Sequence, residues 1–184
     1  PVAPASLSSV RPELPEPGPV RTDIPEKGSD PPAKPQPETE KERAARLRLA
    51  GKDALEKGDL IAARSHFSDA VQTGIAEPDA SAVRGELNRL GSETVLSPRV
   101  FDGDAFTERY VIQPGDSLAK IAKANNVSAD LLADINGIKD KNLIRAGQTI
   151  KVIKGPFHAV VDKSEYTMDV YLGKTLIKHY RVGL

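Results

Sequence analysis

The chain has 184 residues, of which 39% are apolar and 28% charged, and its 26 Lys and Arg residues balance 26 Asp and Glu residues. A net charge of zero offers no basic surface for nucleic acid, and no run of 18 apolar residues is present to span a membrane. Cysteine is absent, and the three histidines are far apart in the sequence. We therefore predict no disulfide, no cysteine nucleophile, no metal site and no other cofactor within these residues.

Residues 1–38 hold eleven of the fifteen prolines, separated mainly by polar and charged residues. Such a segment has few backbone donors for a sheet and few apolar side chains for a core, so it predicts a disordered, extended linker. PxxP spacing also occurs here, as in ligands of SH3 domains, but this composition produces it by chance. A spacer is the preferred interpretation.

Residues 39–91 predict three helices. Thr39 and Glu42 form a capping box at the start of the first helix, and Asp59 supplies the cap of the second. Apolar residues then recur every three or four positions, and Gly91 is expected to stop the third helix.

The first two of these helices weakly resemble a tetratricopeptide helix pair. The matching positions are Gly51, Gly58, Ala63, Phe67 and Ala70. The resemblance implies a peptide partner for the helical segment, while a purely structural mini-domain stays the alternative. Residues 92–107 are expected to be a linker, in which Asp102-Gly103-Asp104 makes a turn, because the further oxygen ligands of a calcium loop are missing.

Residues 108–153 predict a β-α-α-β module. Tyr110–Ile112 has the character of a strand, and Pro114-Gly115 ends it before a short helix. Ser128 caps a second helix, and Thr149–Ile153 alternates as a closing strand that can pair antiparallel with the first.

This module resembles a LysM domain over its whole length. The matching residues are Tyr110, Val111, Gly115, Asp116, Ser117, Leu118, Ile121, Ala122, Leu132, Asn136, Ile144, Gly147, Gln148 and Ile150. The resemblance implies binding to polymers that contain N-acetylglucosamine, chiefly peptidoglycan and chitin. It also implies a groove between the first strand–helix loop and the second helix–strand loop.

Carried onto this chain, the resemblance predicts a glycan-binding site with two walls. One wall is Gly115, Asp116, Ser117 and Leu118, and the other is Asn136, Gly137, Ile138, Lys139 and Ile144. For single residues a structural role is an equal alternative: Asp116 or Ser117 caps a helix, and Asn136 joins two loops. No tryptophan is present to stack on a sugar, so we predict weak binding, in the micromolar to millimolar range.

Residues 156–184 predict a β meander with turns at Asp162-Lys163-Ser164 and at Gly173-Lys174. A three-stranded piece of this length is marginal by itself in water. The segment resembles the opening strands of the L,D-transpeptidase catalytic domain. The matching residues are Val161, Asp162, Ser164, Val170, Tyr171, Gly173, Lys174 and Tyr180.

That family attacks peptide stems of peptidoglycan with a cysteine paired to a histidine, and this chain has neither: it has no Cys, and His158 and His179 do not match the catalytic histidine. We therefore predict no catalytic residue here and an inactive chain, whose parent protein continues into a catalytic domain.

Taken together, the sequence predicts an α+β multidomain chain that binds peptidoglycan and targets an L,D-transpeptidase to it. The alternatives are a non-catalytic LysM anchor that binds peptidoglycan or chitin, and a LysM-bearing wall hydrolase. Either way the expected place of action is the cell envelope or periplasm after export, with the export signal or anchor outside this chain and no membrane span within it.

Overall fold

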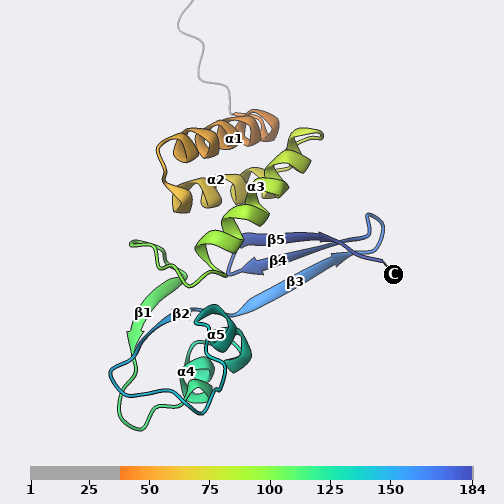
Figure 1. Ribbon diagram of the computed structural model, residues 1–184. Helices are drawn as coiled ribbons and strands as arrows, with labels where there is room; N and C mark the ends of the chain where they lie inside the picture. Colours follow the sequence, from red (N-terminus) through yellow and green to blue (C-terminus); the bar gives the residue numbers. More distant parts are fainter. Residues whose placement is uncertain (1–37, 184) are drawn as a thin grey trace, which may run out of the picture. The chain divides into compact units, whose positions relative to one another are not determined.

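Helices come first along the chain, and small antiparallel sheets follow, so the fold is α+β (Figure 1). The computed structural model describes residues 38–183, and the predicted Pro-rich linker lies outside them apart from Glu38. The helices are α1 (Glu40–Glu56), α2 (Leu60–Gln72), α3 (Asp79–Thr94), α4 (Leu118–Ala124) and α5 (Ala129–Ile135). The strands are β1 (Thr107–Val111), β2 (Thr149–Ile153), β3 (Phe157–Asp162), β4 (Thr167–Leu172) and β5 (Thr175–Arg181). Within the described residues no helix combines the length and apolar character needed to cross a bilayer.

The first two helices begin where the sequence predicts. Thr39 Oγ1 accepts a hydrogen bond from the Glu42 backbone N–H at 3.3 Å, and Glu42 Oε2 accepts from the Thr39 N–H at 2.9 Å. Asp59 Oδ1 accepts from the third residue of its helix, Ala62, at 2.9 Å. These caps satisfy backbone donors that have no partner inside a helix, and both predictions are confirmed.

The predicted end of the third helix at Gly91 is wrong. Helix α3 continues to Thr94, and Gly91 lies buried inside it. A β-carbon at this position would lie only 2.1 Å from the carbonyl oxygen of Ile177 in β5. The glycine therefore lets helix and strand approach closely, and it does not terminate the helix.

The segment predicted as a linker, residues 92–107, is built into the fold. Val95 is fully buried, and Asp104 pairs with Arg64 of α2 at 2.7 Å. Both side chains of that pair are almost fully buried, at 3% exposure for Arg64 and 0% for Asp104. The predicted Asp-Gly-Asp turn is present, but Asp104 is fixed by an ion pair.

The predicted β-α-α-β module is confirmed. Strands β1 and β2 pair antiparallel, with Tyr110 opposite Ile150, and the two short helices connect them. Ser117 and Ser128 are the N-caps of α4 and α5. The module packs around Leu118, Ile121, Leu132, Val152 and Ile153, all buried.

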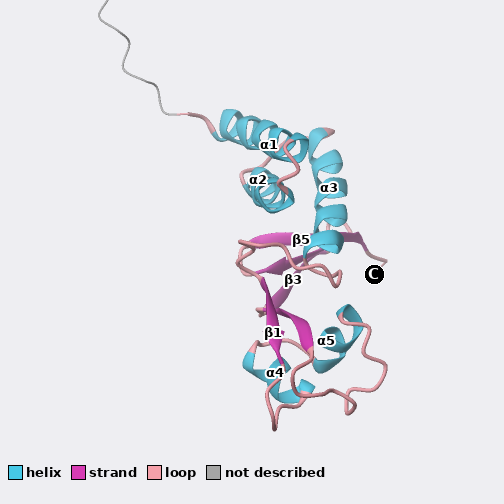
Figure 2. Cartoon of the chain, turned by 60° about the vertical axis from the view of Figure 1, so that its left-hand side comes forward, coloured by secondary structure: helices cyan, strands magenta, loops and turns pink. Residues whose placement is uncertain are grey.

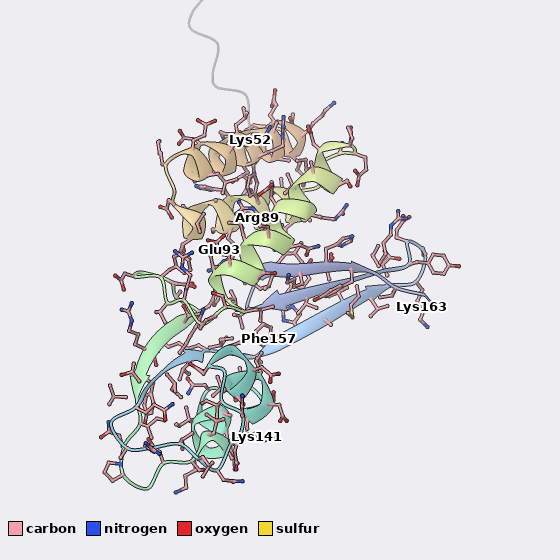
Figure 3. All side chains as sticks on the ribbon, viewed as in Figure 1. Lys52, Arg89, Glu93, Lys141, Phe157 and Lys163 are labelled. Atoms are coloured by element: carbon pink, nitrogen blue, oxygen red, sulfur yellow. The ribbon has the colours of Figure 1, made fainter. Side chains whose placement is uncertain are left out.

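The predicted meander is a three-stranded antiparallel sheet in the order β3-β4-β5, and helix α3 lies beside it (Figures 1 and 2). Leu176 is fully buried in one cluster with Phe67 of α2 and Leu87 of α3. Phe157 at the start of β3 packs against the core of the β-α-α-β module instead (Figure 3). Packing of Leu176 against α2 and α3, and of Leu172, Ile177 and Phe157 against the other core, offsets the instability expected of an isolated three-stranded sheet, although the rest of β3 is exposed.

Candidate glycan-binding site

The loop between β1 and α4 is held by the carboxylate of Asp116. Asp116 Oδ2 accepts hydrogen bonds from the Gln113 backbone N–H and from the Tyr110 hydroxyl, both at 2.8 Å. These donors, the backbone one first, lower the pKa of Asp116, and the same bond raises the pKa of Tyr110. Ser117 caps the helix, accepting from the Lys120 N–H at 3.2 Å, so Asp116 is free of that task and organises the loop.

Gly115 presents open backbone at the tip of this loop. Its φ of +85° is a conformation that L side chains rarely adopt, and no other part of the described protein lies within 4 Å of where a β-carbon would stand. Its carbonyl oxygen accepts from Lys120 Nζ at 2.9 Å. An approaching ligand would therefore meet main chain and one lysine.

Leu118 is a correction to the predicted site. Its side chain is 1% exposed and belongs to the core of the module, because it sits on the inward face of α4. Its side chain cannot touch a glycan, although its backbone adjoins the loop.

In the second wall, Asn136 joins α5 to β2. Its Nδ2 donates to the carbonyls of Leu132 and Lys151 at 2.8 Å, and its Oδ1 accepts from the Lys151 N–H at 2.7 Å. The amide is engaged at both ends, which agrees with the structural alternative for this residue. After it, Gly137 turns the chain with a φ of +64°.

The remaining members of the second wall divide by burial. Ile138 and Ile144 are half-buried and pack against the core that also holds Leu118, whereas Lys139 is exposed. The structure thus places both predicted walls on one hydrophobic core, which fixes their spacing.

Leu143 is a candidate that the predicted site does not include. The sequence predicts that Leu143 and Ile144, which follow the loop after α5, both reach back to the core; Ile144 does, but Leu143 is 74% exposed. A single exposed leucine is common on protein surfaces, so Leu143 is a candidate only because it lies on the second loop of the predicted site.

A small hollow of about 230 Å³ lies on the α4 side of the first loop. It is lined by Tyr110, Asp116, Lys120, Ile121, Ala124 and Asn125. It shares only Asp116 with the predicted site, so this hollow is next to that site and distinct from it.

Comparison with known proteins agrees with this geometry. The LysM domain family matches residues 110–152. An endolysin of Bacillus phage PZA is 49% identical over 78 residues, covering 38% of this chain and 30% of the endolysin. The N-acetylmuramoyl-L-alanine amidase XlyA of Bacillus subtilis is 42% identical over 104 residues, covering 52% of this chain and 35% of the amidase.

The chain thus spans about a third of the length of these relatives. Among solved structures, a MoCVNH3 variant in complex with an N-acetylglucosamine tetramer is 21% identical at a TM-score of 0.27, covering 40% of this chain and 52% of that one. A TM-score of 0.27 does not establish a shared fold. The family match, the confirmed β-α-α-β order and the paired β1 and β2 agree on one conclusion: residues 110–152 are a LysM domain.

Proposed function

We propose that this chain binds the N-acetylglucosamine-containing glycan of peptidoglycan through the two loops of its LysM domain. The observation that carries the proposal is a complete LysM domain whose first loop presents open backbone at Gly115. An N-acetyl sugar offers an amide, hydroxyls and an apolar face. Main-chain groups around Gly115 suit the first two, and the exposed Leu143 with the half-buried Ile138 and Ile144 suits the third.

The test is a titration of the isotope-labelled chain with an N-acetylglucosamine tetramer, followed by NMR. We expect the largest shifts in residues 115–118 and 137–144, with a dissociation constant between micromolar and millimolar. Shifts that avoid both loops would contradict the site.

A pair of substitutions makes the test quantitative. Leu143→Ala should weaken binding about fivefold, because it removes roughly 40 Å² of apolar surface from the interface, at about 25 cal/mol per Å². Val111→Ala is the matched control, because Val111 is also an exposed apolar side chain of the domain, at 48%, but lies on β1 outside both loops. Equally weakened binding in the two variants would remove Leu143 from the site.

The activity of the parent protein has two candidates. The endolysin and amidase relatives favour a LysM-bearing wall hydrolase. The resemblance of residues 156–184 to the first strands of an L,D-transpeptidase favours cross-linking, although neither of these two relatives is such an enzyme. In both, a weak glycan anchor raises the local concentration of substrate around a tethered catalytic domain. A peptidoglycan ligand places this action in the cell envelope.

Sequencing the complete gene, upstream of Pro1 as well as beyond Leu184, separates the candidates. A downstream histidine followed by Ser-x-Gly-Cys-x-Arg would support the transpeptidase. The lack of that motif over about a hundred further codons would eliminate it. A non-catalytic LysM anchor is left if no hydrolase domain is encoded either.

A further inference from the structure

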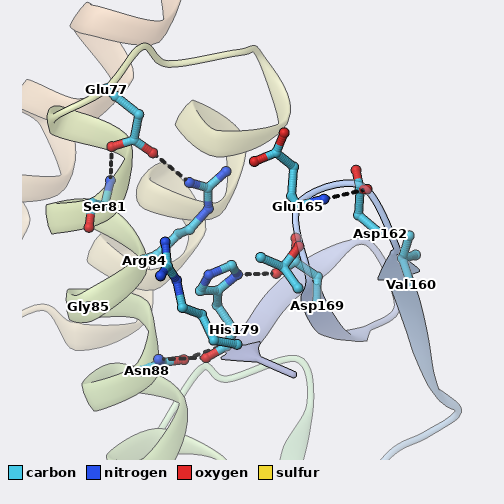
Figure 4. Close-up of a pocket in the computed structure, with 12 residues that line it drawn as sticks. Glu77, Ser81, Arg84, Gly85, Asn88, Val160, Asp162, Glu165, Asp169 and His179 are labelled. Carbon is cyan, nitrogen blue, oxygen red and sulfur yellow. Dashed lines mark hydrogen bonds and ion pairs between the residues drawn. The ribbon is translucent and has the colours of Figure 1, made fainter. Parts of the chain in front are cut away.

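A polar cleft of about 560 Å³ lies between helix α3 and the sheet β3-β4-β5, away from the LysM loops (Figure 4). Arg84 and Ser81 stand on its helical side, and Asp162 and Glu165 stand on its sheet side, at the β3–β4 turn. We propose that this cleft binds a small ligand carrying both a carboxylate and an ammonium group, the charge pattern of an amino acid or a short peptide.

The carboxylate end is assigned to Arg84. Its Nη1 donates to Glu77 Oε1 at 2.9 Å, while Glu77 Oε2 accepts from the Ser81 N–H at 3.0 Å. Glu77 thus fixes the guanidinium against the helix and leaves other donors available. Arg84 Nε is buried and has no hydrogen-bond partner among the described residues. A carboxylate entering the cleft would supply a charged acceptor for this arginine, and Arg181 adds positive charge at the end of β5.

The ammonium end is assigned to Asp162 and Glu165. Asp162 Oδ1 accepts from the backbone N–H groups of Ser164 at 2.8 Å and Glu165 at 3.1 Å, so the turn holds this carboxylate in place. Figure 4 shows both acids on the hairpin side, across the cleft from Arg84. Two exposed carboxylates facing one space attract a cationic group and repel a second anion.

The floor of the cleft is already paired and rigid. His179 Nδ1 lies 2.6 Å from Asp169 Oδ1, with both side chains about four-fifths buried. The Asn88 amide exchanges two hydrogen bonds with the His179 backbone, which fixes this part of β5 against α3. Because the floor groups already have partners, the specificity of the cleft is set by the charged side chains of its two walls.

This arrangement disfavours a phosphate and an apolar molecule. A phosphate would meet four carboxylates, those of Glu77, Asp162, Glu165 and Asp169, around two arginines. An apolar molecule would find polar and charged side chains on nearly every side. A zwitterion satisfies both walls at once.

The test uses the full 184-residue chain, isotope-labelled, titrated with dialanine and followed by NMR. We expect dialanine to shift the Arg84 Nε resonance and the His179 amide. N-acetyl-dialanine, which lacks the ammonium, and dialanine amide, which lacks the carboxylate, should each bind about tenfold more weakly, as expected for losing one charged hydrogen bond. No shift at about 20 mM dialanine, well above the millimolar affinity of a weak site, or equal shifts from all three peptides, would overturn the proposal.

Two substitutions locate the site. Arg84→Gln should weaken dialanine about tenfold, while Arg89→Gln on the same helix should not, because Arg89 pairs with Glu86 and Glu93 outside the cleft. If Arg84→Gln disturbs the fold, Glu165→Gln provides the second variant: it removes one of the two assigned carboxylates and should reduce the preference for dialanine over N-acetyl-dialanine. An undiminished preference in folded Glu165→Gln would contradict the assigned ammonium site.

Two sources can supply such a ligand, a free peptide or a peptide linked to wall glycan. If a soluble glycan-linked peptide shifts the resonances of the cleft and of the LysM loops together, the ligand is a wall peptide. If only free peptides shift the cleft resonances, the ligand is a free peptide. Titration with an N-acetylglucosamine tetramer tests the LysM loops alone, and titration with dialanine tests the cleft alone. A negative result for glycan binding can therefore be distinguished from a negative result for peptide binding.

Discussion

Lys151 connects the LysM domain to the helical segment. Although it sits on the closing strand β2, it is 2% exposed, and its Nζ donates to the carbonyls of Thr94, Ser97 and Arg99 at 2.7, 2.9 and 2.6 Å. Thr94 is the last residue of α3, and Ser97 and Arg99 follow it, where carbonyls lack helical partners. Burial lowers the pKa of Lys151 to about 8, against the opposing effect of nearby Asp104.

This pKa predicts a stability that rises with pH. In the unfolded chain the Lys151 pKa returns to its usual 10.5, so between about pH 8 and 10.5 the unfolded state binds more protons than the folded state. The contribution of Lys151 to the free energy of unfolding therefore increases across that window, and it is constant below it. Burial lowers the pKa of Lys178 as well, so Lys178 adds to the pH dependence of the wild-type stability. The test therefore compares the pH dependence of a Lys151 variant with that of the wild type.

Lys151→Met should flatten this slope in urea unfolding followed between about pH 7.5 and 10. At about pH 7.5 it should also cost about 1–3 kcal/mol, because the buried carbonyl of Thr94 and the part-buried carbonyls of Ser97 and Arg99 lose their donor. Lys123→Met, at an exposed position of α4, is the control and should keep the wild-type slope. An unchanged slope in Lys151→Met would show that the lysine does not titrate in this range.

Two glycines of helix α3 offer a second test at the residue scale. Gly91→Ala places a β-carbon 2.1 Å from the Ile177 carbonyl oxygen, so strand and helix must separate, and we expect a loss of about 1–3 kcal/mol. Gly85→Ala meets nothing within 4 Å and should be neutral or stabilising by about 0.5–1 kcal/mol, since alanine favours a helix. Chemical denaturation measures both, and similar effects of the two would show that the packing against β5 is loose.

Both Gly91 and Lys151 show where a sequence stops being informative. A glycine near the end of a helical pattern predicts a stop, and a lysine in an alternating strand predicts an outward side chain. Each prediction was overturned by a partner far along the chain, Ile177 for Gly91 and Thr94 for Lys151. The caps at Thr39 and Asp59 were predictable because their partners lie within three residues.

At the scale of elements, strand β5 is protected by helices where a neighbouring strand would otherwise be needed. Ser68 Oγ of α2 accepts from the Leu176 N–H at 2.8 Å. From α3, Asn88 accepts from the His179 N–H at 2.7 Å and donates to its carbonyl at 2.9 Å. The Asn88 side chain thus imitates one residue of a paired strand, and an open edge is covered.

Asn88→Ala should leave both His179 backbone groups without a partner. We expect a loss of about 1–3 kcal/mol and faster hydrogen exchange at the His179 amide. Asn142→Ala, on the exposed loop of the LysM domain, is the matched control. Slow exchange at His179 in folded Asn88→Ala would mean that this edge is protected by something other than the asparagine.

The elements themselves were largely predictable, and their assembly was not. Apolar periodicity, caps and turn glycines gave the three helices, the β-α-α-β module and the meander in order. The helical cover of the sheet depends on side chains such as Ser68 and Asn88, which look like ordinary surface residues in a helical pattern. In the candidate glycan site, the loops were predictable by resemblance, whereas the burial of Leu118 and the exposure of Leu143 were decided by packing.

At the scale of the whole described chain, a buried ion pair links the helical segment to the LysM domain. Arg64 of α2 donates from Nη2 to Asp104 Oδ1 at 2.7 Å and from Nη1 to Thr94 Oγ1 at 2.6 Å. Asp104 also accepts from the hydroxyl of Thr107, the first residue of β1, at 3.1 Å. The Asp104 carboxylate therefore binds both Arg64 of α2 and Thr107 of β1, while Arg64 also binds Thr94 at the end of α3. We expect α2, α3 and the LysM domain to unfold together.

Asp104→Asn removes the charge that this buried arginine faces, and we expect a loss of about 3–5 kcal/mol. Because the pair joins elements on both sides, the loss should appear equally at amides of α2, of β5 and of the LysM strands in native-state hydrogen exchange. Asp102→Asn is the matched control: Asp102 is 95% exposed, and its 3.4 Å pair with Arg109 should contribute no more than about 0.5 kcal/mol. If Asp104→Asn speeded exchange in the helices and left exchange at the LysM amides unchanged, the helical segment and the LysM domain would be separate folding units. The connection between them would then be flexible.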